Sequence, residues 1–323
     1  MRNTYLQTFL FLIFSITLYS APFTLNSGHY DSVNDIAKYP YGAIAISVSN
    51  DESIIIWDTN QNKILKNIEF GKGSLTSIAI SPSGKYFVVG NSRGEIFVFD
   101  FASQKMLFSD KLHQSKITDI CFAGRENLFF TSGLDGNIFA YNISTKFVEK
   151  GITMPAKILS LSVSPDKRVI AGGGEKGNIY FINTDNFQIS SVFEKAHSDW
   201  VTGTSFSPDG KYLASVGWDM KLNILNSADG RVFKSINVNT EKALNCVDWS
   251  NDGKYICCGS SNFNIYIYTA PELLPFATLT GHKGQVYQTM FFDSDSIIST
   301  AADAKVNIWS ISQKQLLKTY TGF

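Results

Sequence analysis

Short apolar runs of about four to seven residues, rich in Ile, Val, Phe and Tyr, recur along nearly the whole chain. Turn residues separate the runs, a pattern that is typical of β-strands rather than helices. One run in each repeat closes on an apolar residue followed by a polar one, and these closing residues lie 41 to 43 positions apart: Trp57, Phe99, Tyr141, Ile182, Leu225, Tyr268 and Trp309. A period of about 40–45 residues predicts a propeller built from four-stranded blades.

A second set of positions follows the same period: Val33, Leu75, Ile117, Ile158, Val201, Leu244 and Val286. Turn sequences also fall at equivalent places, at residues 81–84, 164–167, 207–210 and 250–253, where Pro or Gly favours a tight turn. Seven repeats therefore fill residues 29–323 and leave no room for another domain. We expect an all-β chain that forms a single seven-bladed β-propeller of four-stranded antiparallel blades over residues 21–323.

The four histidines, His29, His113, His197 and His282, are spaced by 84, 84 and 85 residues, which is twice the repeat. This spacing indicates one structural position that is revisited in every second blade. Each histidine is followed, at nearly constant spacing, by a hydroxyl residue, an aspartate and the residue that closes the repeat. The sets are His29, Ser47, Asp51 and Trp57; His113, Thr131, Asp135 and Tyr141; His197, Ser215, Asp219 and Leu225; and His282, Ser299, Asp303 and Trp309.

The repeats resemble those of the WD-repeat β-propellers. Gly28-His29 and Gly281-His282 match the Gly-His opening of that family, and Trp57-Asp58 matches its Trp-Asp close. The resemblance implies that each set forms a buried hydrogen-bonded tetrad within one blade. Because Leu225 has no polar group, the network of the fifth blade should be shorter, and the hydroxyl of Tyr141 need not reach the same partner. Ser, His and Asp also make up a hydrolase triad, but four copies at fixed spacing favour a structural role.

Composition and charge restrict the function further. Lys plus Arg and Asp plus Glu each number 28, and no run of like charge offers a basic stripe for nucleic acid. No cysteine pair has zinc-ligand spacing with a histidine, and we expect no metal site and no cofactor. Because no unassigned histidine and no clustered pair of acidic residues remain, we expect a protein that is not an enzyme. A disulfide between Cys246 and Cys258 stays open, although small buried thiols are common.

The N-terminal segment does not belong to the repeat. Residues 1–20 begin with Arg2, continue with an apolar run over residues 6–19 and end with small residues, which is the pattern of a secretory signal. The run is shorter than the roughly 20 residues that span a bilayer as a helix. We therefore expect export, to the periplasm or outside the cell. An uncleaved anchor or an extra strand, in a chain that would otherwise be cytoplasmic, remains the alternative.

Both ends of the propeller resemble an outer strand. Residues 22–25 and residues 316–322 have the same character as residues 276–280, which precede the last Gly-His pair. We expect the C-terminal segment to complete the seventh blade, and the N-terminal segment to cap that blade or run beside it. Mixing strands from both ends closes the ring and conceals a sheet edge.

Two tryptophans point to a binding surface. Trp200 and Trp218 occupy loop positions at which most other repeats carry small or polar residues, and Tyr287 is a weaker candidate. Exposed aromatic residues are enriched in interfaces, although these two indoles could equally stack on each other. We expect a non-catalytic scaffold that binds a protein or peptide on the face formed by the loops, without nucleic acid and without a membrane span once the signal is removed. The alternatives are an exported enzyme or small-ligand binder that uses the axial channel, and an intracellular scaffold.

Overall fold

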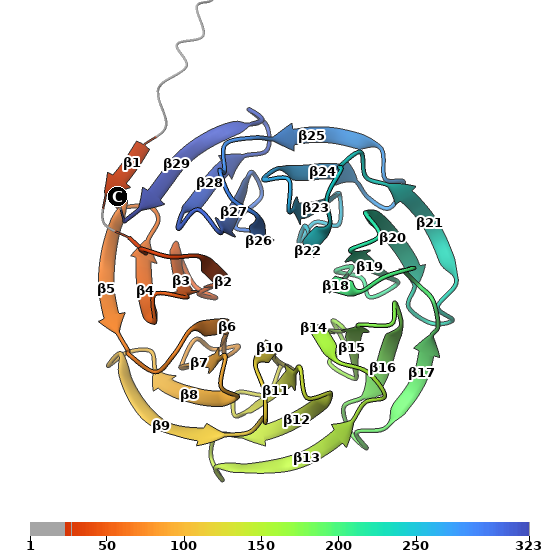
Figure 1. Ribbon diagram of the computed structural model, residues 1–323, viewed down its shortest axis with the longest axis horizontal. Coiled ribbons are helices and arrows are strands. Elements are labelled where there is room, and N and C mark those ends of the chain that lie inside the picture. Colours follow the sequence, from red (N-terminus) through yellow and green to blue (C-terminus); the bar gives the residue numbers. More distant parts are fainter. Residues whose placement is uncertain (1–22, 27, 323) are drawn as a thin grey trace, which may run out of the picture.

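A computed structural model of the chain describes residues 23–26 and 28–322. The described part contains 29 strands arranged as seven sheets around a central axis (Figure 1). This arrangement confirms the predicted all-β, seven-bladed propeller of four-stranded antiparallel blades. Within the described ranges, no helix is long and apolar enough to cross a membrane. The predicted signal segment, residues 1–20, lies outside the described residues.

Each blade runs from an innermost first strand to an outermost fourth strand. Blades 1 to 4 are β2 (Val33–Lys38), β3 (Ile44–Ser49), β4 (Ser53–Asp58) and β5 (Lys63–Glu69); β6 (Leu75–Ile80), β7 (Tyr86–Asn91), β8 (Glu95–Asp100) and β9 (Lys105–Lys111); β10 (Ile117–Phe122), β11 (Leu128–Gly133), β12 (Asn137–Asn142) and β13 (Phe147–Thr153); and β14 (Ile158–Val163), β15 (Val169–Gly174), β16 (Ile179–Asn183) and β17 (Ile189–Phe193). Blades 5 to 7 are β18 (Val201–Phe206), β19 (Tyr212–Gly217), β20 (Lys221–Asn226) and β21 (Val232–Asn237); β22 (Leu244–Trp249), β23 (Tyr255–Ser260), β24 (Ile265–Thr269) and β25 (Pro275–Leu279); and β26 (Val286–Phe291), β27 (Ser296–Ala301), β28 (Val306–Ser310) and β29 (Gln315–Thr321), with β1 (Phe23–Asn26) added to the last blade.

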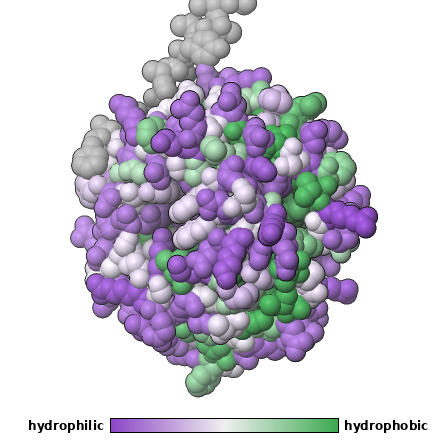
Figure 2. Space-filling view, turned by 45° about the vertical axis from the view of Figure 1, so that its right-hand side comes forward, coloured by the Kyte–Doolittle hydropathy of each residue, from purple (hydrophilic) through white to green (hydrophobic). Residues whose placement is uncertain are grey.

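The core lies between the blades rather than in one central mass. The second and third strands of each blade are buried on both faces, which explains their nearly continuous apolar sequences. Seven hydrophobic clusters follow, and each joins one pair of neighbouring blades. The fourth strands lie outside and expose apolar side chains such as Phe147 on β13 and Phe233 on β21. Figure 2 shows hydrophobic patches within the mostly polar surface of one side of the ring.

The predicted turns connect the first two strands of four blades. In the first of them, the Gly84 amide donates to the Ser81 carbonyl at 2.8 Å, with Gly84 at a φ of +75°. The Ser81 hydroxyl accepts a further bond from the Tyr86 amide at 3.0 Å. Lys167 occupies the same left-handed position in blade 4, where a glycine would be free of strain.

The ring closes in the predicted way. The C-terminal strand β29 pairs antiparallel with β28 and completes blade 7, while β1 pairs with the outer edge of β29 in parallel. Tyr320 of β29 packs its ring 5.0 Å from that of Trp57 in blade 1, and the Lys318 ammonium donates to the Thr59 carbonyl. Residues from the two ends of the chain therefore form the contact between blades 7 and 1.

Candidate functional site: the loop face and the axial channel

We define the loop face as the face on which the chain passes from one blade to the next, together with the turns that join the second and third strands of each blade. Two complete tetrads lie beneath this face. In blade 1, the His29 Nδ1–H donates to Asp51 at 3.0 Å, the Ser47 hydroxyl bonds Nε2 at 2.7 Å, and the Trp57 indole donates to Ser47 at 2.8 Å.

Blade 7 repeats this geometry. His282 lies 3.1 Å from Asp303 and 2.8 Å from the Ser299 hydroxyl, which also accepts the indole N–H of Trp309 at 2.8 Å. Each aspartate also accepts a backbone amide from the loop that carries the histidine, for example Lys283 at 2.7 Å. The tetrad thus joins the loop between two blades to the turn within one blade.

The networks of blades 3 and 5 are shorter, as expected. His113 bonds Asp135 and Thr131, both at 2.9 Å, but the Tyr141 hydroxyl turns away and donates to Asp110 at 3.1 Å. His197 bonds Asp219 and Ser215, both at 2.8 Å, and the position of the missing indole is filled by apolar Leu225. Three members are therefore sufficient to connect loop and turn.

Burial excludes the tetrads as catalytic triads. The hydroxyl residues Ser47, Thr131, Ser215 and Ser299 are each 0% exposed, so no substrate carbonyl can approach them. Burial alone would raise the pKa of Asp51, but the bonds from His29, Ser53 and the Tyr30 amide outweigh it and hold this pKa well below its ordinary value. The carboxylates therefore remain ionised and bonded at neutral pH.

Blades 2 and 6, which lack a tetrad, use other polar side chains on this face. In blade 2, the Asn91 amide donates to the Lys72 carbonyl at 2.8 Å and its oxygen accepts the Arg93 amide at 2.9 Å. In blade 6, the Ser260 hydroxyl donates to the Ala243 carbonyl at 3.0 Å. Blades 2 and 6 therefore also have a side-chain hydrogen bond between the loop and the blade, although they lack the histidine.

A belt of side-chain hydrogen bonds encircles the axial channel. The second residue of five first strands bonds the carbonyl of the first residue of the next blade's first strand, over 2.6–2.8 Å: Asn34 to Leu75, Thr76 to Ile117, Thr118 to Ile158, Thr202 to Leu244 and Asn245 to Val286. Leu159 and Tyr287 occupy the two remaining positions. Each such bond contributes about 1 kcal/mol net, and together they tie neighbouring blades around the channel.

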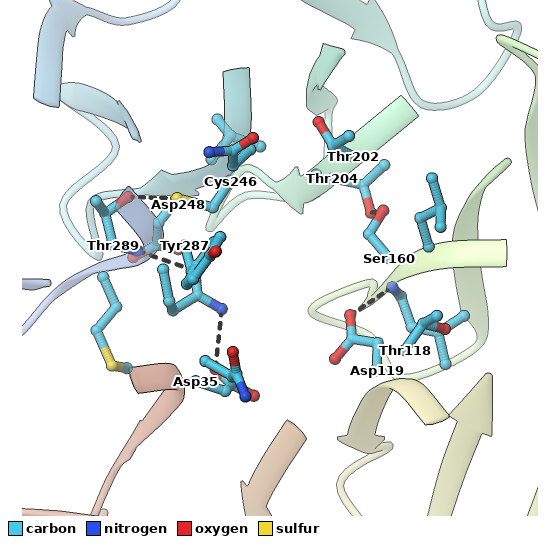
Figure 3. Close-up of a pocket in the computed structure, with 18 of the residues that line it drawn as sticks. Asp35, Thr118, Asp119, Ser160, Thr202, Thr204, Cys246, Asp248, Tyr287 and Thr289 are labelled. Carbon is cyan, nitrogen blue, oxygen red and sulfur yellow. Dashed lines mark hydrogen bonds between the residues drawn. The ribbon is translucent and has the colours of Figure 1, made fainter. Parts of the chain in front are cut away.

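The channel has a volume of about 770 Å³ and, contrary to the sequence-based expectation, gathers acidic side chains. Asp35, Asp119 and Asp248 come from blades 1, 3 and 6 and lie at separate places around the wall (Figure 3). Asp35 and Asp119 each follow a β-bulge near the start of the first strand, which turns the side chain towards the next blade. The two residues are 84 positions apart, so only ring closure brings them to one channel.

These carboxyl groups accept hydrogen bonds from backbone amides of neighbouring blades. One oxygen of Asp35 accepts the Ile78 amide of blade 2 at 2.9 Å, and one oxygen of Asp119 accepts the Leu161 amide of blade 4 at 2.7 Å. Asp248 accepts the Phe291 amide of blade 7 at 2.8 Å. Burial, together with the charge of Asp35, raises the pKa of Asp119 to about 8, and burial raises that of Asp248 to about 6.

We expect the variant Asp119→Asn to change the pH dependence of stability. A raised pKa means that the folded chain binds this proton more tightly than the unfolded chain, so the wild-type protein loses stability as pH rises from about 4 to about 8. Asparagine cannot ionise. As pH rises through this window, the free energy of unfolding of the variant should therefore increase relative to that of the wild type, by at most about 1.4 kcal/mol per pH unit. Urea unfolding at several pH values measures the difference. Asp185→Asn, at an exposed carboxylate, is the control and should give parallel curves.

The two predicted tryptophans lie together at the mouth of the channel. The rings of Trp200 and Trp218 stack with centroids 4.5 Å apart and an interplanar angle of 5°, and Lys157 lies 5.6 Å from the Trp200 centroid. Trp218 nevertheless remains 45% exposed. The stacking alternative is therefore correct, yet it leaves a flat aromatic surface open to solvent.

The third aromatic candidate lies apart from this pair. Tyr287 lines the channel from β26 (Figure 3), at the position where the belt between blades 7 and 1 lacks a short polar side chain. Of the cysteines, Cys246, Cys257 and Cys258 are buried in blade 6 and all four are free. Among the described residues, no group of three His, Cys, Asp or Glu side chains could hold a metal ion.

Comparison with known families matches most of the chain. The model of the Vps8 β-propeller matches residues 42–155, that of the WD40 domain of anaphase-promoting complex subunit 4 matches residues 161–252, and the WD domain, G-β repeat matches residues 21–58 and 274–310. The two segments that match the WD domain, G-β repeat include both tetrads that contain tryptophan.

Several curated proteins are similar over part of their length. Actin-interacting protein 1-2 of Arabidopsis thaliana is 27% identical over 48% of this chain and 26% of its own length. UBP9-binding protein bun62 of Schizosaccharomyces pombe is 32% identical over 35% of this chain and 22% of its own length. Protein FIZZY-RELATED 3 of Arabidopsis thaliana is 25% identical over 85% of this chain and 58% of its own length. The chain thus spans about a quarter to somewhat more than half of these relatives.

Proposed function

Because the chain belongs to the WD-repeat β-propeller family, we propose that it is a non-catalytic scaffold that binds a protein or peptide partner at the mouth of the axial channel on its loop face. The observation that carries the proposal is the Trp200–Trp218 stack, whose outer indole is 45% exposed. Large exposed aromatic side chains on a rigid frame are the residues that most often dominate binding energy. Two of the relatives are named for proteins that they bind, actin and UBP9.

The rigidity of the frame supports the same proposal. The tetrads, the belt of hydrogen bonds and the seven clusters between blades hold the loops in place before a partner arrives. A surface that is already ordered loses little conformational entropy on binding. The ring therefore presents a fixed loop face.

Replacing Trp218 by alanine should abolish capture of the partner and leave folding intact. The side chain is exposed on one side, so its loss costs little stability, while the binding surface loses its largest aromatic group. Affinity purification with the wild-type and variant chains, followed by mass spectrometry, identifies proteins that depend on Trp218. Thermal melting of both chains is the control.

Phe233→Ala is the matched variant, because Phe233 is an equally exposed aromatic residue on the outer strand β21. Partner capture should survive this change. A Trp218→Ala chain that unfolds early, or that still captures every wild-type partner, would contradict the proposed site.

We also propose that the chain is exported. The charged start, apolar run and small residues of residues 1–20 support this assignment. Cell fractionation with N-terminal sequencing of the purified protein tests it, and cleavage near residue 20 or 21 is expected. An intact Met1 on a cytosolic protein would instead place the scaffold inside the cell.

The axial channel offers the second candidate, a small-ligand binder or enzyme. The three aspartates favour it by position, because all three line one channel. However, the two oxygens of Asp35 accept bonds from Ile36, Ile78, Ser77 and Gln288, which leaves this carboxylate little capacity for a substrate. The scaffold function is therefore the better supported.

A further inference from the structure

The charged residues around the channel mouth are unevenly placed. One position, directly before the first strand of each blade, carries lysine in blades 3 and 4 and tryptophan in blade 5, namely Lys116, Lys157 and Trp200. In the other four blades it carries Ser32, Ser74, Ala243 and Gln285. Lys116 and Trp200 line the channel together with Trp218, and the Lys157 ammonium lies over the Trp200 ring.

The two lysines differ in their surroundings. The Lys157 ammonium is 3.2 Å from a carboxylate oxygen of Glu175 and also lies over the Trp200 ring. The Lys116 side chain is exposed at the channel, and its ammonium has neither a carboxylate nor a hydrogen-bond acceptor among the described residues. A cation without a counter-charge gains more from an incoming anion than a cation that is already paired with a carboxylate.

The tryptophans add unused hydrogen-bond donors. Neither the Trp200 nor the Trp218 indole N–H donates to any described residue, in contrast to the indoles of Trp57 and Trp309, which are bonded inside their tetrads. An indole N–H can only donate. The mouth of the channel thus presents unpaired donors and positive charge on the side of blades 3 to 5, next to a flat apolar surface.

Resting on the scaffold function above, we propose that the partner segment is an acidic peptide in which an aspartate or glutamate stands next to an aromatic or large aliphatic residue. The carboxylate pairs with Lys116, and the apolar side chain lies on the open face of Trp218. Charge complementarity decides for this partner, because Lys116 has no counter-charge among the described residues, whereas Lys157 is already paired with Glu175.

The aspartates deeper in the channel do not argue against an acidic peptide. Asp35 and Asp119 are bonded to amides of the next blade, and the raised pKa of Asp119, about 8, reduces its negative charge near neutrality. A single-stranded nucleic acid would also stack on tryptophan and pair with lysine. It needs a groove of many cations along its backbone, however, and among the described residues the channel lining carries only Lys38 and Lys116, on a chain of zero net charge.

Selection from a displayed library of random linear peptides on the immobilised full chain tests the proposal, with the Trp218→Ala chain used for counter-selection. We expect enrichment of Asp or Glu beside Phe, Tyr, Trp or Leu. A recovered peptide should bind the Lys116→Glu chain at least about ten-fold more weakly and the Lys116→Gln chain with an intermediate loss. The affinity should also fall as salt rises. Lys283→Glu, on the same face but outside the channel lining, should leave binding unchanged.

The outcomes separate the two claims. Peptides that bind the wild-type and Trp218→Ala chains alike, or no recovered peptide at all, would overturn the proposed function and this inference together. Peptides that depend on Trp218 but are basic or neutral, or that are indifferent to Lys116→Glu, would overturn the acidic partner only. Competition of these peptides by oligouridine would assign the mouth to nucleic acid and likewise overturn the proposal.

Discussion

Removal of residues 314–323 is expected to lower the melting temperature by at least about 10 °C, or to abolish cooperative unfolding altogether. The deletion takes away β29, the outer strand that completes blade 7, and with it the buried ring of Tyr320. Burial of one such aromatic side chain stabilises by roughly 1.5–3 kcal/mol, and the loss also uncovers Trp57 and strand β28. Because total stability is only about 5–15 kcal/mol, the ring cannot absorb this loss. Circular dichroism melting measures it.

A chain that starts at Gly28 is the matched control. It lacks β1, which lies outside β29 and pairs with it in parallel, but it keeps all four strands of blade 7. We expect a fall of only a few degrees, since an outer edge strand adds little to the contact between blades 7 and 1. If the shortened N-terminus were the more damaging of the two truncations, closure by the C-terminal strand would be wrong.

The sequence predicted the blades well because the same buried positions are apolar in every repeat. The second and third strands face neighbouring blades on both sides, so their apolar residues recur without interruption. The His–Asp spacing of 21 or 22 residues follows from the nearly constant length of the first two strands and the turn between them. The order of strands at the ring closure was also predictable, since Phe276 and its neighbours provide an internal template for an outer strand.

The channel was not predictable from the spacing alone. Asp35 and Asp119 stand two positions after Val33 and Ile117, a position that carries Ser, Gly, Cys or Gln in the other blades, so no repeated pattern marks it. Their common direction comes from a bulge, which is a property of strand pairing rather than of the local sequence. For Trp200 and Trp218 the sequence left stacking and exposure open as alternatives, and the structure shows both together.

Replacement of His282 by alanine is the second change for which we expect a large effect, a loss of about 3 kcal/mol in the free energy of unfolding. The imidazole connects Asp303 to Ser299, and Ser299 in turn accepts the indole N–H of Trp309. Without it, the buried Asp303 carboxylate loses its charge-assisted bond and the Ser299 hydroxyl loses its acceptor. Urea unfolding of the two chains measures the loss. Lys283→Ala, at the adjacent exposed residue, should cost little.

The pH dependence distinguishes this network from simple packing. Burial pulls the pKa of Asp303 up, but the bonds from His282 and from backbone amides outweigh it and hold this pKa below its ordinary value. A depressed carboxylate pKa contributes stability above the unfolded pKa of about 3.9 and loses that contribution as pH falls through the folded pKa. The difference between wild type and His282→Ala should therefore be largest near neutral pH and shrink below about pH 4. A difference that stays constant down to the acid transition would mean that His282 acts by filling space and not by bonding Asp303.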